Sequence, residues 1–369
     1  MNKVAVVILN WNGKPMLEQY LAPLVKNTPT QIISKNTSEN NIVSVIIADN
    51  NSTDGSIDWV KRNFPNIQTI ILNENYGFTG GYNRALQQVE AEDFVLRNSD
   101  ILVPDNWLQP LINFMDTHPD VGICQPKMLS LATHMQVMDK KEKLEEFEYA
   151  GAAGGFIDRW GFPFCRGRII STIEKDSGQY DTPMQVFWAS GACMVVKSSL
   201  WRELGGLDES FFAHMEEIDF CWRAQLNGYQ VWAVAQSHVF HLGGGTLPND
   251  SPRKMFFNYR NNLLMLYKNL PVDSGWEVFG FKKFNRNAFI FIRMCIDGLT
   301  AVAYTLQGKF SFAAAVYKAH NAFRRMKKEA AITQMDNNRP YKPVGIVPIS
   351  IIIKKVLGIT TFGKLLKQS

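Results

Sequence analysis

Apolar runs of strand length alternate with helix-like patterns over the first 130 residues of this 369-residue chain. The strand candidates are Val4–Leu9, Ile42–Ala48, Ile67–Leu72, Phe94–Leu96 and Val121–Ile123. The helix candidates between them are Lys14–Val25, Ser56–Asn63, Gly80–Val89 and Asn106–Thr117. Because the first two strands are almost continuous Val and Ile, both faces of their sheet should be covered. This pattern predicts an α/β fold with a mostly parallel central sheet flanked by helices.

The pattern becomes less regular after residue 130. Residues 134–183 show no period, so we expect an irregular excursion over the sheet, and the polar stretch 31–41 is expected to be a surface loop. Regular structure should then return. The expected elements are a strand over 186–196, helices over 198–204 and 216–226, and a strand over 230–234.

Charge divides the chain into two parts. Residues 247–369 contain 20 Lys and Arg but only 6 Asp and Glu, a net charge of about +14, so residues 1–246 carry about −9. We therefore expect a catalytic or binding domain over 1–246 and a basic, helical region over 247–369. The basic region favours an anionic partner such as a membrane surface. Nucleic acid is not expected, since the region lacks a module with interleaved aromatic residues.

The basic region contains an apolar stripe at helical spacing. Its members are Phe289, Ile292, Ile296, Leu299 and Ala303, with Arg293 and Lys309 off the stripe. Two interpretations remain open: a helical hairpin packed on the first domain, or peripheral attachment to the inner membrane. No transmembrane helix is expected, because Arg293 and Asp297 interrupt the segment. The N-terminus looks like a first strand, not a signal peptide, and the five scattered cysteines suggest reduced, mostly buried thiols in the cytosol.

Polar residues follow each of the first strands, where an open α/β sheet forms its ligand crevice. After the first two strands come Asn10-Trp11-Asn12-Gly13 and Asp49 to Gly55, although Ser52 to Gly55 alone would more often be a capping turn. After the next two come Asn73 to Gly81 and Asn98-Ser99-Asp100. Asp49 could accept a nucleobase N–H, and a glycine-rich loop can approach a diphosphate. Asp100 is a lone carboxylate, with Asn98 where a divalent metal would take a second acid.

Two further clusters lie later in the chain. Glu216, Glu217 and Asp219 stand at a helix start, where they could complement the helix dipole or supply a general base. His241 precedes Gly243 to Gly245, so it could be an ordinary packed histidine or a ligand that closely approaches an ion or phosphate.

Several of these motifs, in this order, resemble the family 2 glycosyltransferases, which use nucleotide sugars and have the GT-A fold, particularly the rhamnosyltransferase-like and galactofuranosyltransferase-like members. The matching stretches are VVILNWNG (6–13), IIADNNSTDGS (46–56), NENYGFTGGYNRAL (73–86), LRNSDI (96–101), ASGACMVVKSSLWRELGGLDESFFAHMEEIDFCWRAQLNGYQVW (189–232) and HVFHLGGGT (238–246). The resemblance implies a nucleotide-sugar-binding half over 1–130 and an acceptor and catalytic half over 131–246.

The resemblance also implies roles for individual residues. Those implied for the nucleotide sugar are Asn10, Asn12, Asp49, Asn75, Gly77, Asn83 and Asn98. Asp100 and His241 would hold a divalent metal, Mn²⁺ or Mg²⁺, with Asn98 replacing the first acid of the family's Asp-Xaa-Asp motif. The run Glu216-Glu217-Ile218-Asp219 matches the catalytic motif, with Glu217 as the base and Glu216 as the alternative.

Together these features predict an inverting, metal-dependent glycosyltransferase. It would move a hexosyl or deoxyhexosyl group from a nucleoside-diphosphate sugar to a glycan or polyprenyl-linked acceptor in the bacterial cell envelope, in the cytoplasm or on the cytoplasmic face of the inner membrane. A catalytically inactive, sugar-nucleotide-binding scaffold with the same fold is the main alternative, supported by Asn98. A nucleotidyltransferase is less favoured, because its first loop should be glycine-rich and basic, and here it offers only Lys14.

Overall fold

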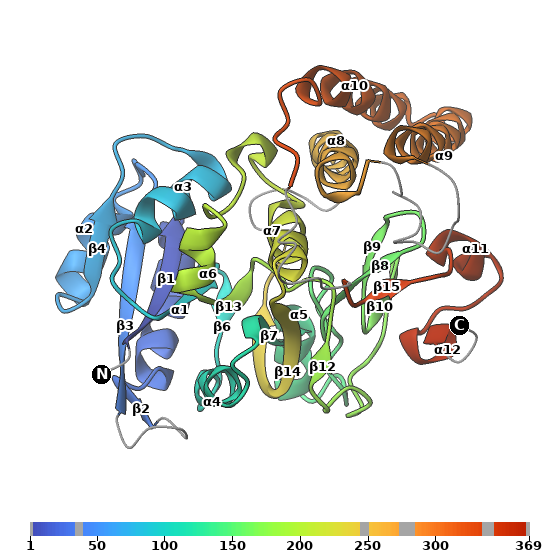
Figure 1. Ribbon diagram of the computed structural model, residues 1–369. Coiled ribbons are helices and arrows are strands. Elements are labelled where there is room, and N and C mark those ends of the chain that lie inside the picture. The colour runs from blue at the N-terminus through green and yellow to red at the C-terminus, as the bar shows by residue number, and fades with distance from the viewer. Residues whose placement is uncertain (1–2, 34–39, 244–250, 273–284, 334–342, 367–369) are drawn as a thin grey trace.

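The structure is a computed structural model, and it describes residues 3–33, 40–243, 251–272, 285–333 and 343–366. Its centre is a ten-stranded mixed sheet, shown in Figure 1, with the order β12-β14-β7-β13-β5-β1-β3-β2, in which β4 also pairs with β3 and β6 with β14. The strands are β1 (Lys3–Asn10), β2 (Gln31–Ile33), β3 (Asn40–Asp49), β4 (Gln68–Ile71), β5 (Asp93–Arg97), β6 (Ile101–Leu102), β7 (Val121–Ser130), β12 (Met184–Gln185), β13 (Cys193–Lys197) and β14 (Gln230–His241).

Strands β4, β3, β1 and β5 are parallel neighbours, as the sequence predicts. The sheet then becomes mixed, because β13 lies antiparallel between β5 and β7. The expectation of one strand over 186–196 is wrong: β13 begins only at Cys193, and β12 ends at Gln185. The expected loop over 31–41 begins with the short strand β2, and its residues 34–39 lie outside the described residues.

Both faces of the sheet are covered, which confirms the interpretation of the apolar strands. Alternate residues of β1 enter two different cores, with Val4, Val6 and Ile8 in one and Ala5 and Val7 in the other. The first core is closed by α1 (Lys14–Asn27) and α4 (Gln109–Thr117). The second is closed by α3 (Gly77–Leu86), α6 (Ser198–Glu203) and α7 (Glu216–Leu226). Helices α2 (Ser56–Asn63) and α7 have the predicted bounds.

A second, five-stranded sheet takes four of its strands from the stretch expected to be irregular. It is built from β8 (Gly155–Asp158), β9 (Pro163–Cys165), β10 (Arg168–Ile169), β11 (Thr172–Ile173) and β15 (Ile346–Val347). The same stretch contains most of helix α5 (Leu131–Met138). The strands are two to four residues long, too short to show a period in the sequence, so only the tertiary pairing identifies them.

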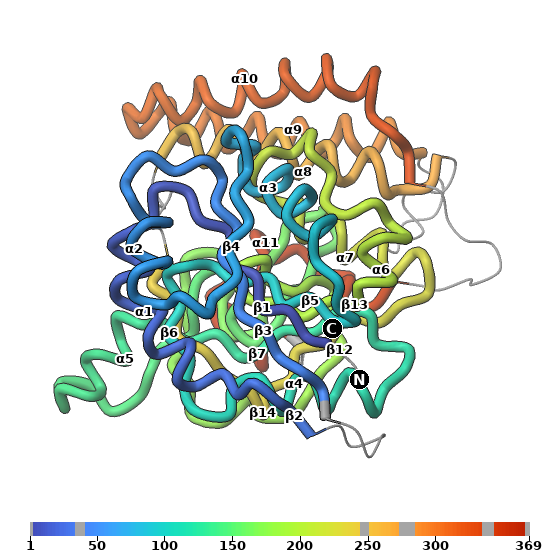
Figure 2. Tube along the Cα trace, turned by 90° about the vertical axis from the view of Figure 1, so that its left-hand side faces the viewer, coloured from blue at the N-terminus to red at the C-terminus, as the bar shows by residue number. Residues whose placement is uncertain are grey.

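The C-terminal part forms a helical bundle and then returns to the first domain. Helices α8 (Pro252–Asn269), α9 (Arg286–Leu306) and α10 (Phe310–Met326) lie together along one end of the molecule, as Figure 2 shows. After them β15 joins the second sheet beside β8, and α11 (Ile351–Val356) and α12 (Phe362–Leu366) follow. Helical structure is therefore confirmed for the bundle, while the tail completes a sheet that begins more than 180 residues earlier.

The apolar stripe predicted for α9 is not the face that the helix buries. The helix buries Arg286, Phe289, Ile290, Arg293 and Asp297, whereas Leu299 and Ala303 are exposed. By length and composition alone, α9 could also cross a membrane, contrary to the expectation from its charges. Arg293 and Asp297 are buried inside the bundle, where they pair with each other and with side chains of the neighbouring helices.

Candidate active site

The carboxyl ends of β1 and β3 meet at one buried polar corner. Parallel register places Asn10 beside Asp49. The Asn10 Nδ2 donates to Asp49 Oδ1 at 2.9 Å and to Ser56 Oγ at 2.9 Å, while the Ser52 backbone N–H donates to Asp49 Oδ2 at 2.9 Å. The Asn10 Oδ1 is buried and has no hydrogen-bond partner among the described residues. This corner therefore keeps a desolvated acceptor available.

Gly13 leaves room for that acceptor. A Cβ at Gly13 would lie 2.5 Å from Asn10 Oδ1, and 3.6 Å from Ser99 Oγ. The loop after β1 thus lies against both the Asn10 amide and the turn that holds Asp100. Asn12 has a different role: its Oδ1 accepts from Thr53 N at 2.8 Å, and its backbone N–H donates to Ser52 Oγ at 2.9 Å. Its contacts join the first two loops, so its predicted ligand contact stays a prediction.

Asn50 organises the glycine-rich loop, and sequence reasoning did not single it out. Its Nδ2 donates to Asn75 Oδ1 and to the Gly77 carbonyl, both at 2.9 Å, and its Oδ1 accepts from Tyr76 N at 3.0 Å. Gly77 has a φ of 70°, and a Cβ there would lie 2.9 Å from the ring of Phe212. The glycine is thus required both by its backbone conformation and by close packing.

Asn83 binds the backbone of Leu207, in the segment that leads to α7. Its amide oxygen is therefore not free to contact a nucleotide. Its Nδ2 donates to the Leu207 carbonyl at 2.7 Å, and its Oδ1 accepts from Leu207 N at 2.9 Å. We therefore assign Asn83 a structural role, in place of the contact that the resemblance implied. Asn83 and Leu207 are 124 positions apart in the sequence, so this pair of hydrogen bonds forms only in the folded chain.

Asp100 and His241 are brought together by strand pairing. β6 pairs antiparallel with β14 so that His241 lies opposite Ile101. The His241 Nε2 is 3.2 Å from Asp100 Oδ1, and its Nδ1 is 3.4 Å from Glu148 Oε1. All three side chains are buried. The structure thus places the two predicted metal ligands side by side and adds Glu148, which sequence reasoning missed because it lies in the aperiodic stretch.

The two carboxylates decide the charge of this histidine. Burial alone would lower the pKa of His241, but the contacts with Asp100 and Glu148 outweigh it and raise that pKa to about 10. Burial likewise acts to raise the pKa of Asp100, yet the hydrogen bond from His241 holds it below the ordinary value. The contacts with Asp100 and Glu148 therefore favour the protonated form of His241.

The geometry around His241 fits a divalent ion. Two ligand atoms about 2.1 Å from one ion, at right angles, lie about 3 Å apart, close to the separation of His241 Nε2 and Asp100 Oδ1. A carboxylate at the other ring nitrogen, here Glu148, orients a metal-bound histidine. The ion would have to displace the proton on Nε2. Among the residues that the structure describes, no group of three His, Cys, Asp or Glu side chains is arranged to hold a metal, so within this part of the chain the candidate ligands are Asp100 and His241.

Arg97 closes the turn that carries these residues. It is buried at the end of β5, and its guanidinium donates to the Ile101 carbonyl across residues 98–100. Burial lowers the pKa of Arg97 to about 10, an effect that the nearby Asp100 opposes. Asn98, half-buried, donates its backbone N–H to the Ala192 carbonyl at 2.9 Å. Sequence reasoning missed Arg97, although an arginine at the end of a buried apolar strand is unusual and could have indicated a structural role.

The acid pair at the start of α7 is the second chemical centre. Glu216 is buried and Glu217 half-buried, and the Oε2 of each has no hydrogen-bond partner among the described residues. Burial raises the pKa of Glu217 to about 7, although backbone N–H groups at the helix start oppose it. Burial and the neighbouring Glu217 raise the pKa of Glu216 well above its ordinary value. A carboxylate with a pKa near neutral is suited to accept a proton.

Asp219 lacks the free oxygen that a catalytic acid or base needs. Its carboxylate, fully buried, accepts from Arg223 Nε at 2.8 Å, from Lys268 Nζ at 3.1 and 3.2 Å, and from Asn269 Nδ2 at 2.8 Å. The catalytic role predicted for Asp219 is not supported by these contacts. We assign it instead the joining of α7 to α8.

The two centres share one turn. A Cβ at Gly191 would lie 3.4 Å from Glu217 Cβ and 3.4 Å from the ring of Phe78, which belongs to the glycine-rich segment. The next residue, Ala192, binds Asn98. The base candidate, the metal corner and the glycine-rich loop therefore meet around residues 191–192. Of the predicted triple-glycine turn, Gly243 approaches Glu148, whereas Gly244 and Gly245 lie outside the described residues.

Comparisons with known proteins agree with this architecture. Residues 5–168 match the model of the glycosyl transferase family 2. The chain is 24% identical over 282 residues to an N-acetylglucosaminyl-diphospho-decaprenol L-rhamnosyltransferase of Mycobacterium tuberculosis, a match that covers 73% of this chain and 85% of the relative. It is 25% identical over 173 residues to the rhamnosyltransferase WbbL of Escherichia coli, covering 45% and 61%.

A third relative and one solved structure extend the picture. The low-salt glycan biosynthesis hexosyltransferase Agl10 of Haloferax volcanii is 22% identical over 232 residues, covering 60% of this chain and 67% of the relative. The crystal structure of GalNAc-T7 with UDP, GalNAc and Mn²⁺ superposes with a TM-score of 0.50 at 15% identity, covering 73% of this chain and 48% of that one.

The mixed sheet, with polar loops at one edge and an acid pair at the start of a facing helix, has the GT-A fold. The match to glycosyl transferase family 2 covers residues 5–168, and the relatives are named glycosyltransferases, so this chain is a glycosyltransferase similar to that family and to its rhamnosyltransferases.

Proposed function

We propose that this glycosyltransferase is metal-dependent and inverting, and that it transfers a hexosyl or deoxyhexosyl group from a nucleoside-diphosphate sugar to a hydroxyl of a glycan or lipid-linked acceptor. The observation that carries the proposal is Glu217. It is a half-buried carboxylate with a raised pKa and an oxygen lacking a partner among the described residues. Residues 191–192 connect it to the loop that contains Asp100, because Gly191 lies beside Glu217 and Ala192 binds Asn98.

The donor would be held by the loops after β1, β3 and β4. The unpartnered Asn10 Oδ1 and the Asp49 carboxylate offer buried acceptors for a nucleobase N–H. The backbone of the glycine-rich loop, which Asn50 holds through Asn75 and Gly77, offers N–H groups near a diphosphate. Asp100 and His241 would hold Mn²⁺ or Mg²⁺, which, when bound, stabilises negative charge on a leaving diphosphate.

Glu217 would supply the proton transfer. Its carboxylate takes the proton of the acceptor hydroxyl, the hydroxyl oxygen bonds to the anomeric carbon, and the bond from that carbon to the diphosphate oxygen breaks on the opposite side. The electron pair leaves with the nucleoside diphosphate, and the configuration inverts. Positioned general bases contribute about 10² to 10⁴ in rate.

The relatives suggest the class of substrate. One is named a rhamnosyltransferase acting on N-acetylglucosaminyl-diphospho-decaprenol, so we propose a deoxyhexosyl donor and a polyprenyl-diphosphate-linked acceptor for this chain. Such an acceptor would be met at the cytoplasmic face of the inner membrane during synthesis of a cell-surface polysaccharide.

The test is a screen of nucleotide sugars for hydrolysis and transfer by the purified protein, with and without Mn²⁺ or Mg²⁺. Glu217→Gln should lower the transfer rate at least about 100-fold while nucleoside diphosphate binding stays close to wild type. Glu216→Gln is the matched comparison and should reduce the rate less. If binding of the nucleoside diphosphate is indifferent to metal and no nucleotide sugar is turned over, the inactive scaffold is the better description.

A further inference from the structure

Helix α9 buries three charged side chains beside Phe289 and Ile290, and it exposes several large apolar side chains on its outer face. The buried side contains Arg286, Arg293 and Asp297. The outer side carries Phe291, Leu299, Val302 and Leu306, which are 68, 71, 56 and 84% exposed. At about 100° per residue, these four and the exposed Cys295 fall within an arc of about 80°. We call these five residues the α9 stripe.

The buried polar side has its partners within the bundle. Arg293 donates to Asn262 Oδ1 of α8 at 2.8 Å, contacts Asp297 at 3.3 Å, and lies over the Phe162 ring at 3.5 Å. Asp297 is also 3.5 Å from His320 Nε2 of α10. If α9 crossed a bilayer alone, this polar cluster would enter hydrocarbon without its partners, at high cost. The cluster therefore keeps α9 in the bundle and leaves only the α9 stripe for an apolar medium.

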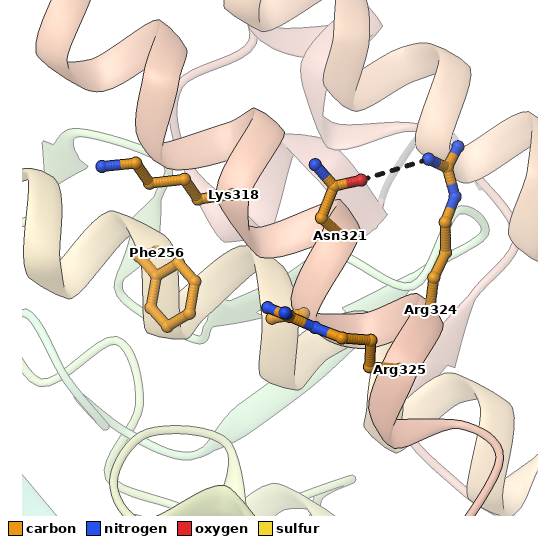
Figure 3. Close-up of a pocket in the computed structure, with 6 residues that line it drawn as sticks. Phe256, Lys318, Asn321, Arg324 and Arg325 are labelled. Atoms are coloured by element: carbon orange, nitrogen blue, oxygen red, sulfur yellow. Dashed lines mark hydrogen bonds between the residues drawn. The ribbon is translucent and has the colours of Figure 1, made fainter.

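Helix α10 also exposes apolar side chains and, further along, a cation. Phe310 and Tyr317 of α10 are exposed at helical spacing, and the exposed Arg324 follows on the same face. Beside them, a groove of about 650 Å³ lies between α8 and α10, lined by Phe256, Lys318, Asn321, Ala322, Arg324 and Arg325, as Figure 3 shows. Three of its six lining residues are cations, so the groove suits phosphate groups.

We propose that the α9 stripe and the basic groove of α10 form a docking surface for an anionic lipid bilayer, with α9 lying in the plane of the interface. Apolar side chains beside cations are the pattern of interfacial helices, which combine insertion with attraction to anionic headgroups. A second copy of this chain fits less well, because two such surfaces would bring their cations together.

The location of this surface suits an acceptor carried by a lipid. Helix α8 lies beneath α10 and contacts the segment before the acid pair, since Asn261 donates to the carbonyls of Phe211, Ala213 and His214 at 3.0, 2.8 and 2.7 Å. Phe257 of α8 stacks on Phe212 at 5.8 Å. The bilayer would thus meet the bundle whose inner helix supports the catalytic segment. This inference relies on the proposed function only for the nature of the acceptor.

Vesicle flotation of the full chain tests the proposal. With phosphatidylcholine vesicles containing 30% phosphatidylglycerol at low salt, the protein should float, and Leu299→Gln/Leu306→Gln should lower the partition coefficient about 100-fold, because each leucine gains about tenfold or more on entering an apolar phase. Met135→Gln/Met138→Gln, which changes two exposed methionines of α5, is the matched control and should behave as wild type.

Charge is tested in the same assay. Arg324→Gln/Arg325→Gln should lower binding to anionic vesicles by roughly tenfold or more, an effect that disappears in 0.5 M salt or without phosphatidylglycerol. Lys61→Gln/Arg62→Gln, an exposed basic pair on α2, should change binding less than twofold. All variants should retain wild-type nucleotide-sugar hydrolysis in solution.

Several results would overturn the proposal: wild type that stays unbound with anionic vesicles at low salt, stripe variants that bind as wild type does, or a wild-type dimer that the Leu299 and Leu306 changes convert to monomer. If vesicles bind as expected but no nucleotide sugar is turned over, the proposed glycosyl transfer fails while the docking surface stands.

Discussion

Asn261 offers the sharpest test of how the catalytic segment is held. Its side-chain amide, fully buried in α8, donates to three backbone carbonyls of the segment before the acid pair, those of Phe211, Ala213 and His214. Within that segment, Phe212, His214 and Met215 have φ values of 64, 69 and 73°. Left-handed backbone at such residues costs about 1 kcal/mol or more each, so it must be imposed from outside.

The size of the effect follows from these contacts. The Nδ2 carries two hydrogens, so Asn261→Ala removes at most two full hydrogen bonds, worth about 1–3 kcal/mol. If that energy holds Glu217 in position, the competent population should fall by about 5- to 150-fold. We expect kcat to fall within this range, with a much smaller change in the KM for the nucleotide sugar, whose loops Asn261 does not contact.

Asn262→Ala is the matched control. Asn262 is the next residue of α8, equally buried, and its amide bonds to Gly161 and Arg293, away from the acid pair. Both variants should lose similar stability in urea denaturation, but only Asn261→Ala should lose kcat per folded molecule, measured by initial rates of nucleoside diphosphate release. Equal kcat in the two variants would refute the role assigned to Asn261.

Three further predictions concern single groups. Asp100→Ala should weaken metal-dependent nucleoside diphosphate binding, measured by calorimetry with Mn²⁺, more than Asn98→Ala does; the reverse order would show that Asn98 is the ligand. Because burial raises the pKa of Glu217 and its ionised form is the base, kcat/KM should rise with pH through about 7 and then level off, and this rise should be missing in Glu217→Gln. Asp219→Ala should cost about 3–5 kcal/mol of unfolding free energy, because Lys268 and Arg223 lose a buried partner, and a variant of unchanged stability would contradict its structural role.

Local patterns in the sequence were sufficient for the elements that place the donor loops. The strands around Val4, Ile42 and Phe94 are apolar runs, and the helices beginning at Ser56 and Glu216 have the predicted bounds, because period and turn chemistry depend only on near neighbours. The same local information placed Asp49, Asp100 and Glu217 at strand ends and at a helix start.

Contacts between distant residues were decided by the tertiary structure. Only the pairing of β6 with β14 brings His241 to Asp100, and only the folding of the aperiodic stretch adds Glu148 to them. Asp219 has the sequence of a catalytic acid, yet Lys268, 49 residues away, neutralises it.

Helix α9 shows most clearly what the sequence predicts and what only the tertiary structure decides. Its sequence contains an amphipathic helix, but apolar periodicity cannot tell which face is buried when buried charges find partners. Arg293 and Asp297 are inside because Asn262 and His320, from two other helices, meet them there. The sequence by itself determined the parallel core and the loops at its carboxyl edge, since these follow from local period. Which charges are buried, which acids remain free and which apolar face remains exposed depended on long-range pairing, which only the folded chain supplies.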